Sequence, residues 1–474
     1  MNNNNHYYTA FLLLPALMLF SCSQDEESLR VEADGDSEIA FTAILPGVAS
    51  RSESSVTGSL DDGFHVTAFC PEDESKIDGS GSMRAYFDYQ LVTKTPGMGN
   101  AFRSEMCRWP ENTGTKEGTL KFFAFYPSLE VLRDRSGGNE NNFKLTNSST
   151  KKGTTITYKY VMEKFKVNRD ISRHVDFVMA TAQENKKNGL YSGVALQFEH
   201  QLARVDFKAW GNPTAYDVEI AGIRLGNVYT ECNLDFAQKP NISYQAKDNT
   251  QNGQWLKSPT PTKGVVEYIY QEGESVIQIK NGGQYNTSAK ATSLMGNAGS
   301  AFVIPAVYSY WKKTKADAGI YISVLLRVKD KDGMQQYPYI EGASMNTTTT
   351  TAKMNVIYFA VDKSTGLINK RVYKKIGEYY TDEEGTIPYT VSANEEIRDY
   401  GWAALPFSSS SNTTLKSGCQ YTYTLDYTSG VGVEDPADVR PGYAIITPVT
   451  PDVSVSSFTS GGTTDVTDKI TIIP

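Results

Sequence analysis

The stretch VALQFEHQLARVDFKAW, from Val194 to Trp210, decides the fold class of this chain. Apolar residues alternate with polar ones, first around Leu196 and Phe198 and again at Val205 and Phe207. A period of two residues places successive side chains on opposite faces of a strand. The stretch therefore predicts β-structure in which one face of each strand is buried.

Other short runs along the chain show the same alternation, and turn residues separate them. Strands with one buried face pack into sandwiches, so the fold class that we expect is all-β, with β-sandwich domains. The predicted strands are Ile39–Leu45, Phe64–Phe69, Leu120–Tyr126, Asp217–Leu225, Ala301–Ile304, Ile320–Val328, Asn355–Val361 and Tyr421–Tyr427.

The connecting segments carry weaker signals. Asp330-Lys331-Asp332-Gly333 predicts the turn of a hairpin after Ile320–Val328. A short helix is expected at Ala393–Tyr400, since Ser392 or Asn394 can cap it and acidic residues suit a first helical turn. Residues 139–157 and 344–351 are predicted to be long polar loops.

The predicted strands fall into two halves. We expect a signal peptide at 1–21, an acidic tether at 22–37, an N-terminal β-sandwich at 38–192 and a C-terminal β-sandwich at 193–474. The last part of the second unit, about 428–474, is predicted to be a strand-like extension. In this extension, short apolar runs alternate with Pro and Gly.

Composition excludes several classes of protein. The 474 residues include 39% hydrophobic and 21% charged residues, as in a folded domain rather than a disordered chain. The net charge of -8 gives no basic footprint for nucleic acid. Mean hydropathy is -0.40, which excludes a protein with many membrane spans.

The N-terminus indicates export. Tyr8–Phe20 is apolar but too short to span a membrane, which is typical of a signal peptide. It ends in Leu19-Phe20-Ser21-Cys22, which resembles a bacterial lipobox, although no Lys or Arg precedes the apolar run. We predict cleavage before Cys22 and acylation of that cysteine, which would bind the protein to outer-membrane lipid. The alternative is an ordinary signal peptide in which Cys22 is incidental.

Two further observations bear on location and thiol chemistry. The acidic Asp25-Glu26-Glu27 resembles the tag that sends some lipoproteins to the outer face of the outer membrane, so we expect a cell-surface protein. Cys70, Cys107, Cys232 and Cys419 lack zinc-like spacing. The sequence does not decide between disulfides and buried thiols.

A search for catalytic motifs favours a protein that is not an enzyme, with no cofactor and no metal site. No H-E-x-x-H, G-x-S-x-G or Walker-type motif is present. His200 is expected to be a core or edge histidine with a hydrogen-bond partner. Asp382-Glu383-Glu384 is expected to be a solvated loop rather than a glycosidase pair. Trp109 and Trp402 could be sugar-stacking platforms, but core positions are favoured.

Several pieces of the chain, in this order and spacing, resemble the fimbrillin family of pilus subunits and pilus-like lipoproteins from Gram-negative anaerobes. The run Leu196-x-Phe198-x-His200-x-Leu202 is the most specific piece. The others are Cys22, Ile39–Phe41 with Ser50-Arg51, Asp62–Val66, Arg108–Pro110, Leu120–Pro127, Asp176–Ala180 and Val303–Pro305.

The resemblance implies two transthyretin-like Greek-key domains in tandem and a structural role in a surface fimbria that mediates adhesion. It also implies assembly by strand exchange, with other fimbrial subunits as partners. A protease would cut after Arg51 and release the first strand, and a C-terminal strand of a neighbour would then fill the groove. Arg30 is a weaker candidate, because a cut there keeps the first strand. Tyr443–Val455 and Val466–Ile473 are the candidate donors.

Two other functions remain open at this stage. The first is a surface lipoprotein that does not polymerise and binds a glycan or a host ligand through exposed aromatic side chains. The second is a glycan-processing enzyme, which would need two facing carboxylates about 5–10 Å apart. An exposed aromatic cluster would favour the first alternative, whereas a buried and removable first strand would favour the fimbrial subunit.

Overall fold

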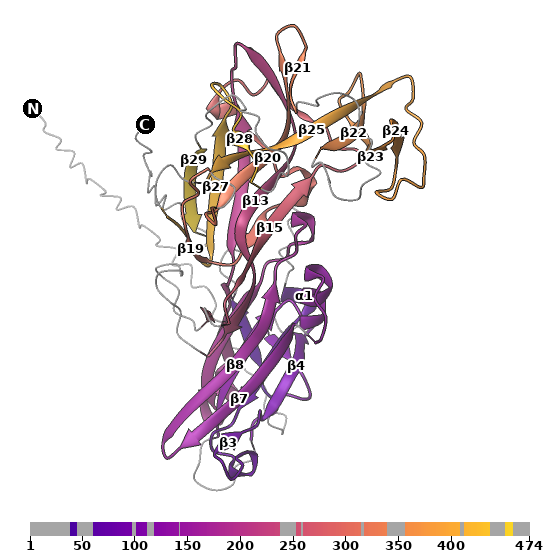
Figure 1. The fold of residues 1–474 in the computed structure, drawn as a ribbon. Coiled ribbons are helices and arrows are strands. Elements are labelled where there is room, and N and C mark those ends of the chain that lie inside the picture. The colour runs from indigo at the N-terminus through magenta and orange to yellow at the C-terminus, as the bar shows by residue number, and fades with distance from the viewer. Residues whose placement is uncertain are drawn as a thin grey trace, which may run out of the picture.

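The computed structural model describes residues 38–44, 60–96, 101–110, 118–141, 143–237, 253–256, 259–313, 317–338, 356–407, 412–436 and 451–457. These residues form an elongated molecule built almost entirely of strands, with the N-terminal part at one end and the C-terminal part at the other (Figure 1). The predicted all-β class is confirmed.

An eight-stranded sheet forms most of the N-terminal part. The strands at the two ends of its spatial order are close to each other in the chain. The first and last strands in the order, β10 and β11, are separated in the chain only by Phe198. In spatial order the strands are β10 (Val194–Gln197), β1 (Phe41–Ile44), β5 (Ala101–Arg103), β4 (Phe87–Lys94), β2 (Phe64–Phe69), β6 (Thr119–Tyr126), β9 (Val178–Asn185) and β11 (Glu199–His200).

A fourteen-stranded sheet runs along the whole molecule (Figure 1). Its main path is β24 (Glu378–Tyr380), β23 (Ile368–Lys375), β22 (Ile357–Asp362), β25 (Glu395–Pro406), β20 (Tyr321–Asp330), β13 (Tyr216–Asp235), β8 (Thr155–Lys166), β7 (Lys144–Lys152) and β3 (Ser82–Met83). Five further strands pair beside this path: β14 (Gln254–Trp255), β15 (Thr262–Ile269) and β16 (Ile277–Ile279) on β13, β21 (Gln335–Tyr337) on β20, and β28 (Val433–Glu434) on β25.

The third sheet belongs to the C-terminal part. It follows the order β17 (Thr292–Ser293), β12 (Ala203–Trp210), β27 (Cys419–Asp426) and β29 (Pro451–Ser457), and β18 (Ala301–Val303) also pairs with β12. A separate pair joins β19 (Ala306–Tyr308) to β26 (Thr413–Leu415). Alternate residues of β27 are buried, as the alternating sequence predicts.

The described part contains two α-helices, α1 (Leu129–Ser136) and α2 (Lys186–Ser192). Ser128 caps α1 by accepting a hydrogen bond from the Val131 N–H, and Gly137 ends the helix in the left-handed conformation. Leu129 and Leu132 bury one face of α1 against the core. No helix among the described residues is long and apolar enough to cross a membrane.

Strand β6 separates two hydrophobic cores. Phe122 and Ala124 belong to a smaller cluster with Phe41 and Phe64, enclosed by the eight-stranded sheet. Phe123 and Phe125 alternate with them and face a larger cluster that continues into the C-terminal part as far as Tyr427. The run Phe122–Phe125 is continuously apolar because this part of the strand is buried on both faces.

The two parts share strands. β13 pairs with β8 near its C-terminal end and with β20 near its start, so one strand of 20 residues serves both parts. β10 and β11 follow residue 193 in the chain but pair with β1 and β9. The boundary between 192 and 193 stays a prediction.

Two predicted segments differ from the structure. The helix at 393–400 is wrong: these residues enter β25, where Glu395–Tyr400 pair with β22 and the strand then continues against β20. The loop at 139–157 is wrong from Lys144 onward, because β7 and β8 form a long hairpin around Gly153. The hairpin turn at Asp330–Gly333 is confirmed, with β21 paired back onto β20.

Candidate functional site

The site is the position of the first strand, β1, inside the eight-stranded sheet. β1 pairs in parallel with β10, from Phe41 opposite Val194 to Ile44 opposite Gln197. On its other side it pairs antiparallel with β5. A strand of only 4 residues therefore lies between two neighbours rather than at an edge.

The buried side chains at the start of this segment explain why the sequence places it there. Ile39 and Phe41 are 0% exposed and belong to the smaller core cluster. The ring of Phe41 meets those of Phe64 and Phe122 edge to face, with centroids 6.3 and 5.5 Å apart. Burial of each large apolar side chain contributes about 1.5–3 kcal/mol. Ile44, at the end of the strand, is instead 52% exposed.

Backbone hydrogen bonds hold both sides of the strand. The Ile39 N–H donates to the Cys107 carbonyl at 2.8 Å, and the carbonyls of Ala40 and Ile44 accept from the N–H groups of Val194 and Phe198 at 2.8 Å. Because these bonds use the main chain, another segment with the same alternation could make them as well.

Gly193 allows β10 to approach β1 closely. Its φ is +70°, and a Cβ atom there would lie 3.0 Å from the Ala40 carbonyl oxygen. Glu38, just before β1, lies 3.8 Å from Arg103 on β5, and this ion pair is partly exposed. Sequence reasoning missed both β5 and this pair. The sequence signal for β5 is limited to the two apolar residues Ala101 and Phe102 before Arg103, and two residues are too few to predict a strand.

A second relevant element is β29 in the C-terminal extension. It pairs antiparallel with β27, from Leu425 opposite Pro451 to Cys419 opposite Ser457, and it is the outermost strand of its sheet. β29 overlaps the end of the predicted donor Tyr443–Val455. The rest of that donor, and all of Val466–Ile473, lie outside the described residues.

His200 has a structural environment, as predicted. Its Nδ1 bonds the carboxylate of Asp176, and both side chains are buried. Beside it, the Gln201 carbonyl accepts a hydrogen bond from the Trp255 indole at 2.9 Å. The hydrogen bond between His200 and Asp176 joins β11 to the segment before β9, and β11 also pairs with β9 through the backbone. The most specific piece of the sequence pattern is thus part of the packing beside the site.

The other candidate residues are also structural. Trp109 is 1% and Trp402 2% exposed, so neither offers a stacking platform at the surface. The Asp382 carboxylate accepts hydrogen bonds from its own turn, from the N–H groups of Thr386 and Ile387. Within the described residues, no group of three or more His, Cys, Asp or Glu could hold a metal ion.

The four described cysteines are buried free thiols, and burial raises the pKa of Cys107 and of Cys232 to about 12. Cys22 and Arg51 lie outside the described residues, and so does the second candidate for the cut, Arg30.

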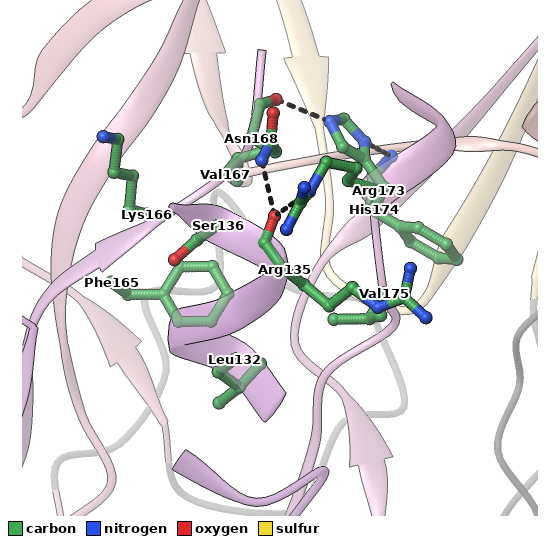
Figure 2. A pocket seen from close by; sticks show the side chains of 11 residues that line it. Leu132, Arg135, Ser136, Phe165, Lys166, Val167, Asn168, Arg173, His174 and Val175 are labelled. Carbon is green, nitrogen blue, oxygen red and sulfur yellow. Dashed lines mark hydrogen bonds between the residues drawn. The ribbon is translucent and has the colours of Figure 1, made fainter. Parts of the chain in front are cut away.

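A narrow cavity of about 20 Å³ lies beyond the end of α1, between Leu132, Phe165 and Phe302. It has room for about one water molecule. Figure 2 shows how its polar residues serve the helix end: Asn168 and Arg173 donate to the Arg135 carbonyl, and His174 donates from Nε2 to the Asn168 carbonyl. The Phe302 N–H donates to Nδ1 of the same histidine. The polar groups around this cavity are therefore used to cap the end of α1, and we do not interpret the cavity as a ligand site.

Comparisons with known proteins give a weak likeness. No protein-family model matches the chain, and no curated protein resembles it significantly in sequence. A structure from Bacteroides uniformis, whose description assigns it to cell adhesion, matches 90% of this chain and 99% of its own, with 11% identity and a TM-score of 0.32. One from Parabacteroides distasonis with the same description matches 89% and 97%, with 9% identity and a TM-score of 0.33.

The tip fimbrial protein Mfa3 from Porphyromonas gingivalis, with a C-terminal truncation, matches 89% of this chain and 100% of its own. Its identity is 7% and its TM-score 0.29. These descriptions name the kind of protein that the sequence resemblance indicates. At such identities and TM-scores, the role of this chain has to be argued from its own residues.

Proposed function

We propose that this chain is a structural subunit of a surface fimbria that mediates adhesion and assembles by strand exchange. In this proposal it is exported as a lipoprotein with an acyl chain on Cys22, reaches the outer face of the outer membrane, and is cut after Arg51. The observation that carries the proposal is β1: a short first strand that is paired on both sides and contributes buried side chains to the core.

Loss of β1 would open a groove that needs a replacement. The groove would expose the pairing edges of β10 and β5, together with apolar side chains such as Phe64 and Phe122. Unpaired edges and exposed apolar surface favour the addition of a strand from another molecule. Because donor and groove are different surfaces, each added subunit would leave a new groove or a new donor free, which produces a filament.

β29 supports the donor side of the proposal. It already adds to the edge of a sheet through main-chain hydrogen bonds, which shows that this segment accepts a strand conformation. In a neighbouring subunit the extension would pair with β10 and β5 in place of β1.

The test is the N-terminus of the surface-exposed protein, read by mass spectrometry. We expect the assembled wild-type chain to begin at Ser52. Arg51→Gln should keep β1 and an acylated Cys22 and remain monomeric, whereas Arg30→Gln serves as the matched control and should be processed like the wild type. Assembled wild-type fibres whose subunits still carry the acylated Cys22 would refute the strand-release step.

A further inference from the structure

A separate polar cavity is lined by residues of β3, β4 and β7 and of the segments next to them. Figure 1 shows these strands in the N-terminal part of the molecule. The cavity volume is about 390 Å³, within the range of about 300–1,000 Å³ that small-ligand sites occupy. Its lining includes Asp78, Arg84, Asp88, Asn147 and Ser148. None of the lining residues belongs to β1, β5 or β10.

The carboxylate of Asp88 is fixed by its neighbours. Its Oδ1 accepts a hydrogen bond from the Thr67 hydroxyl at 2.7 Å, and Thr67 is fully buried and accepts in turn from the Tyr160 hydroxyl at 2.9 Å. Its Oδ2 accepts from Asn147 Nδ2 at 2.7 Å. Asp88 is thus oriented from the core side before any ligand arrives, and each oxygen retains a second acceptor site.

The lining residues of β3 are held by backbone contacts. Ser82 and Met83 pair with Thr150 and Ser149 of β7, so β3 is joined to β7. Gly81 makes this possible, because its φ is +82° and a Cβ there would lie 2.8 Å from the Lys151 carbonyl oxygen. The Arg84 N–H donates to the Lys76 carbonyl at 2.9 Å, which fixes the main chain that carries the guanidinium.

Arg84 is an exposed side chain that supplies donors to the cavity. Of the two carboxylates in the lining, Asp78 has its pKa lowered mainly by hydrogen bonds from Ser80 and in part by the nearby charge of Arg84, but neither Asp78 nor Asp88 forms a direct ion pair with it. The Asp78 carboxylate instead turns its Oδ1 to its own loop, where the N–H groups of Ser80 and Ser82 donate to it at 2.9 Å.

We propose that this cavity binds a neutral saccharide, as a terminal sugar of a surface glycan. A sugar ring presents hydroxyl groups that both donate and accept, together with an apolar C–H face. Arg84 only donates, Asp88 only accepts, and Asn147 and Ser148 can do both. Ala85, which is partly buried, lies in the lining and offers an apolar contact for the ring. The site would give the adhesion subunit a ligand, but it does not depend on strand exchange.

Other ligand classes fit less well. An anionic sugar or a phosphate would meet the two carboxylates, and a cationic group would meet Arg84. An added peptide strand would have to pair with the sheet edge at β3, which is only 2 residues long.

The test is saturation-transfer-difference NMR on the purified full-length chain, with the methyl glycosides of mannose, galactose, glucose, fucose and N-acetylglucosamine as probes. At least one probe should bind, and Arg84→Ala and Asp88→Asn should each weaken its affinity by about tenfold or more, the typical effect of hydrogen bonds to charged groups. Arg371→Ala and Asp332→Asn change the same residue types outside the cavity and should bind like the wild type.

Three results would overturn the proposal: binding to none of the probes, binding that survives in both cavity variants, or stronger binding of a sialic acid glycoside than of any neutral sugar. The cavity variants should be processed at the N-terminus like the wild type, so failure of the sugar test and failure of the assembly test are distinguishable.

Discussion

His174 is the residue whose chemistry makes the clearest prediction about stability. It is buried beside the narrow cavity beyond the end of α1. Its Nε2 donates to the Asn168 carbonyl, and its Nδ1 accepts from the Phe302 N–H. A neutral ring makes both bonds, and a protonated ring would lose the second. Burial lowers its pKa from 6.5 to about 4. The Asn168 carbonyl and the charge of Asp170 act in the opposite direction and raise the pKa, but burial outweighs them. The other charged groups that line the cavity are Arg135, Lys166 and Arg173.

A lowered pKa in the folded state means that protonation favours unfolding. The stabilisation from neutral His174 is complete above pH 6.5 and is lost as the pH falls toward 4, and it amounts to about 3 kcal/mol. We expect the wild type to lose more free energy of unfolding than His174→Gln over this range, as measured by urea denaturation. Carboxylates that titrate in the same window cancel in the difference. Parallel pH profiles for the two proteins would contradict this assignment.

Single residues were predicted best where the sequence pattern fixed their surroundings. His200 sits in an alternating run, so a buried position with a hydrogen-bond partner followed from its place, and Asp176 is that partner. The cavity residues Asp78, Arg84 and Asp88 could not be recognised. They come from a turn, a connection and a strand that the fold places beside β7. Their spacing in the sequence does not indicate that they line one cavity.

At the level of elements, the extension can be tested by truncation. Among the described strands β29 pairs only with β27, so a chain ending at Thr450 should melt within a few degrees of the wild type. If Tyr443–Val455 is the donor, that chain should fail to form multimers in size-exclusion chromatography after residues 1–51 are removed. A chain ending at Ser457 is the matched control and should still assemble. Loss of assembly in both truncated chains would point to Val466–Ile473 instead.

Strands with apolar alternation were predicted, and strands of other composition were missed. β2, β6, β20 and β27 all match predicted runs. β7 has the sequence KLTNSSTKK, and only its backbone pairing with β8 identifies it as a strand. Its Ser, Thr and Lys residues resemble a loop because little of this hairpin's outer face is covered.

β25 shows how tertiary contacts override a local helix signal. Glu395 suits a first helical turn by composition, but its carboxylate accepts hydrogen bonds from the Ser392 N–H, the Asn369 amide and the Tyr389 hydroxyl. These partners come from β23 and the preceding loop, so the segment is held extended beside β22. A local pattern of about eight residues cannot contain that information.

At the scale of the whole molecule, a buried contact joins the start of the C-terminal extension to the body of the protein. Arg224 on β13 donates to the Asp435 carboxylate at 3.0 Å, and both side chains are buried. Arg224 also stacks over Trp402, with 4.1 Å between the guanidinium and the ring, and lies 3.6 Å from Glu267. In a fibre, any pull on the extension would reach β13 through this contact, and β13 continues into the N-terminal part.

The buried Arg224–Asp435 pair predicts that removing one charge destabilises the protein more than removing both. Asp435→Asn leaves Arg224 buried, with Glu267 as its remaining carboxylate partner among the described residues, and breaking a buried pair in this way costs about 3–5 kcal/mol. The double variant Arg224→Met with Asp435→Leu removes both charges and should lose much less, because it also removes the cost of burying them. The measurement is the free energy of unfolding for both single variants and the double variant, combined in a cycle. Additive losses would mean that the two charges act independently. A strong coupling would instead mean that Arg224 and Asp435 act as one buried pair that joins the start of the extension to β13.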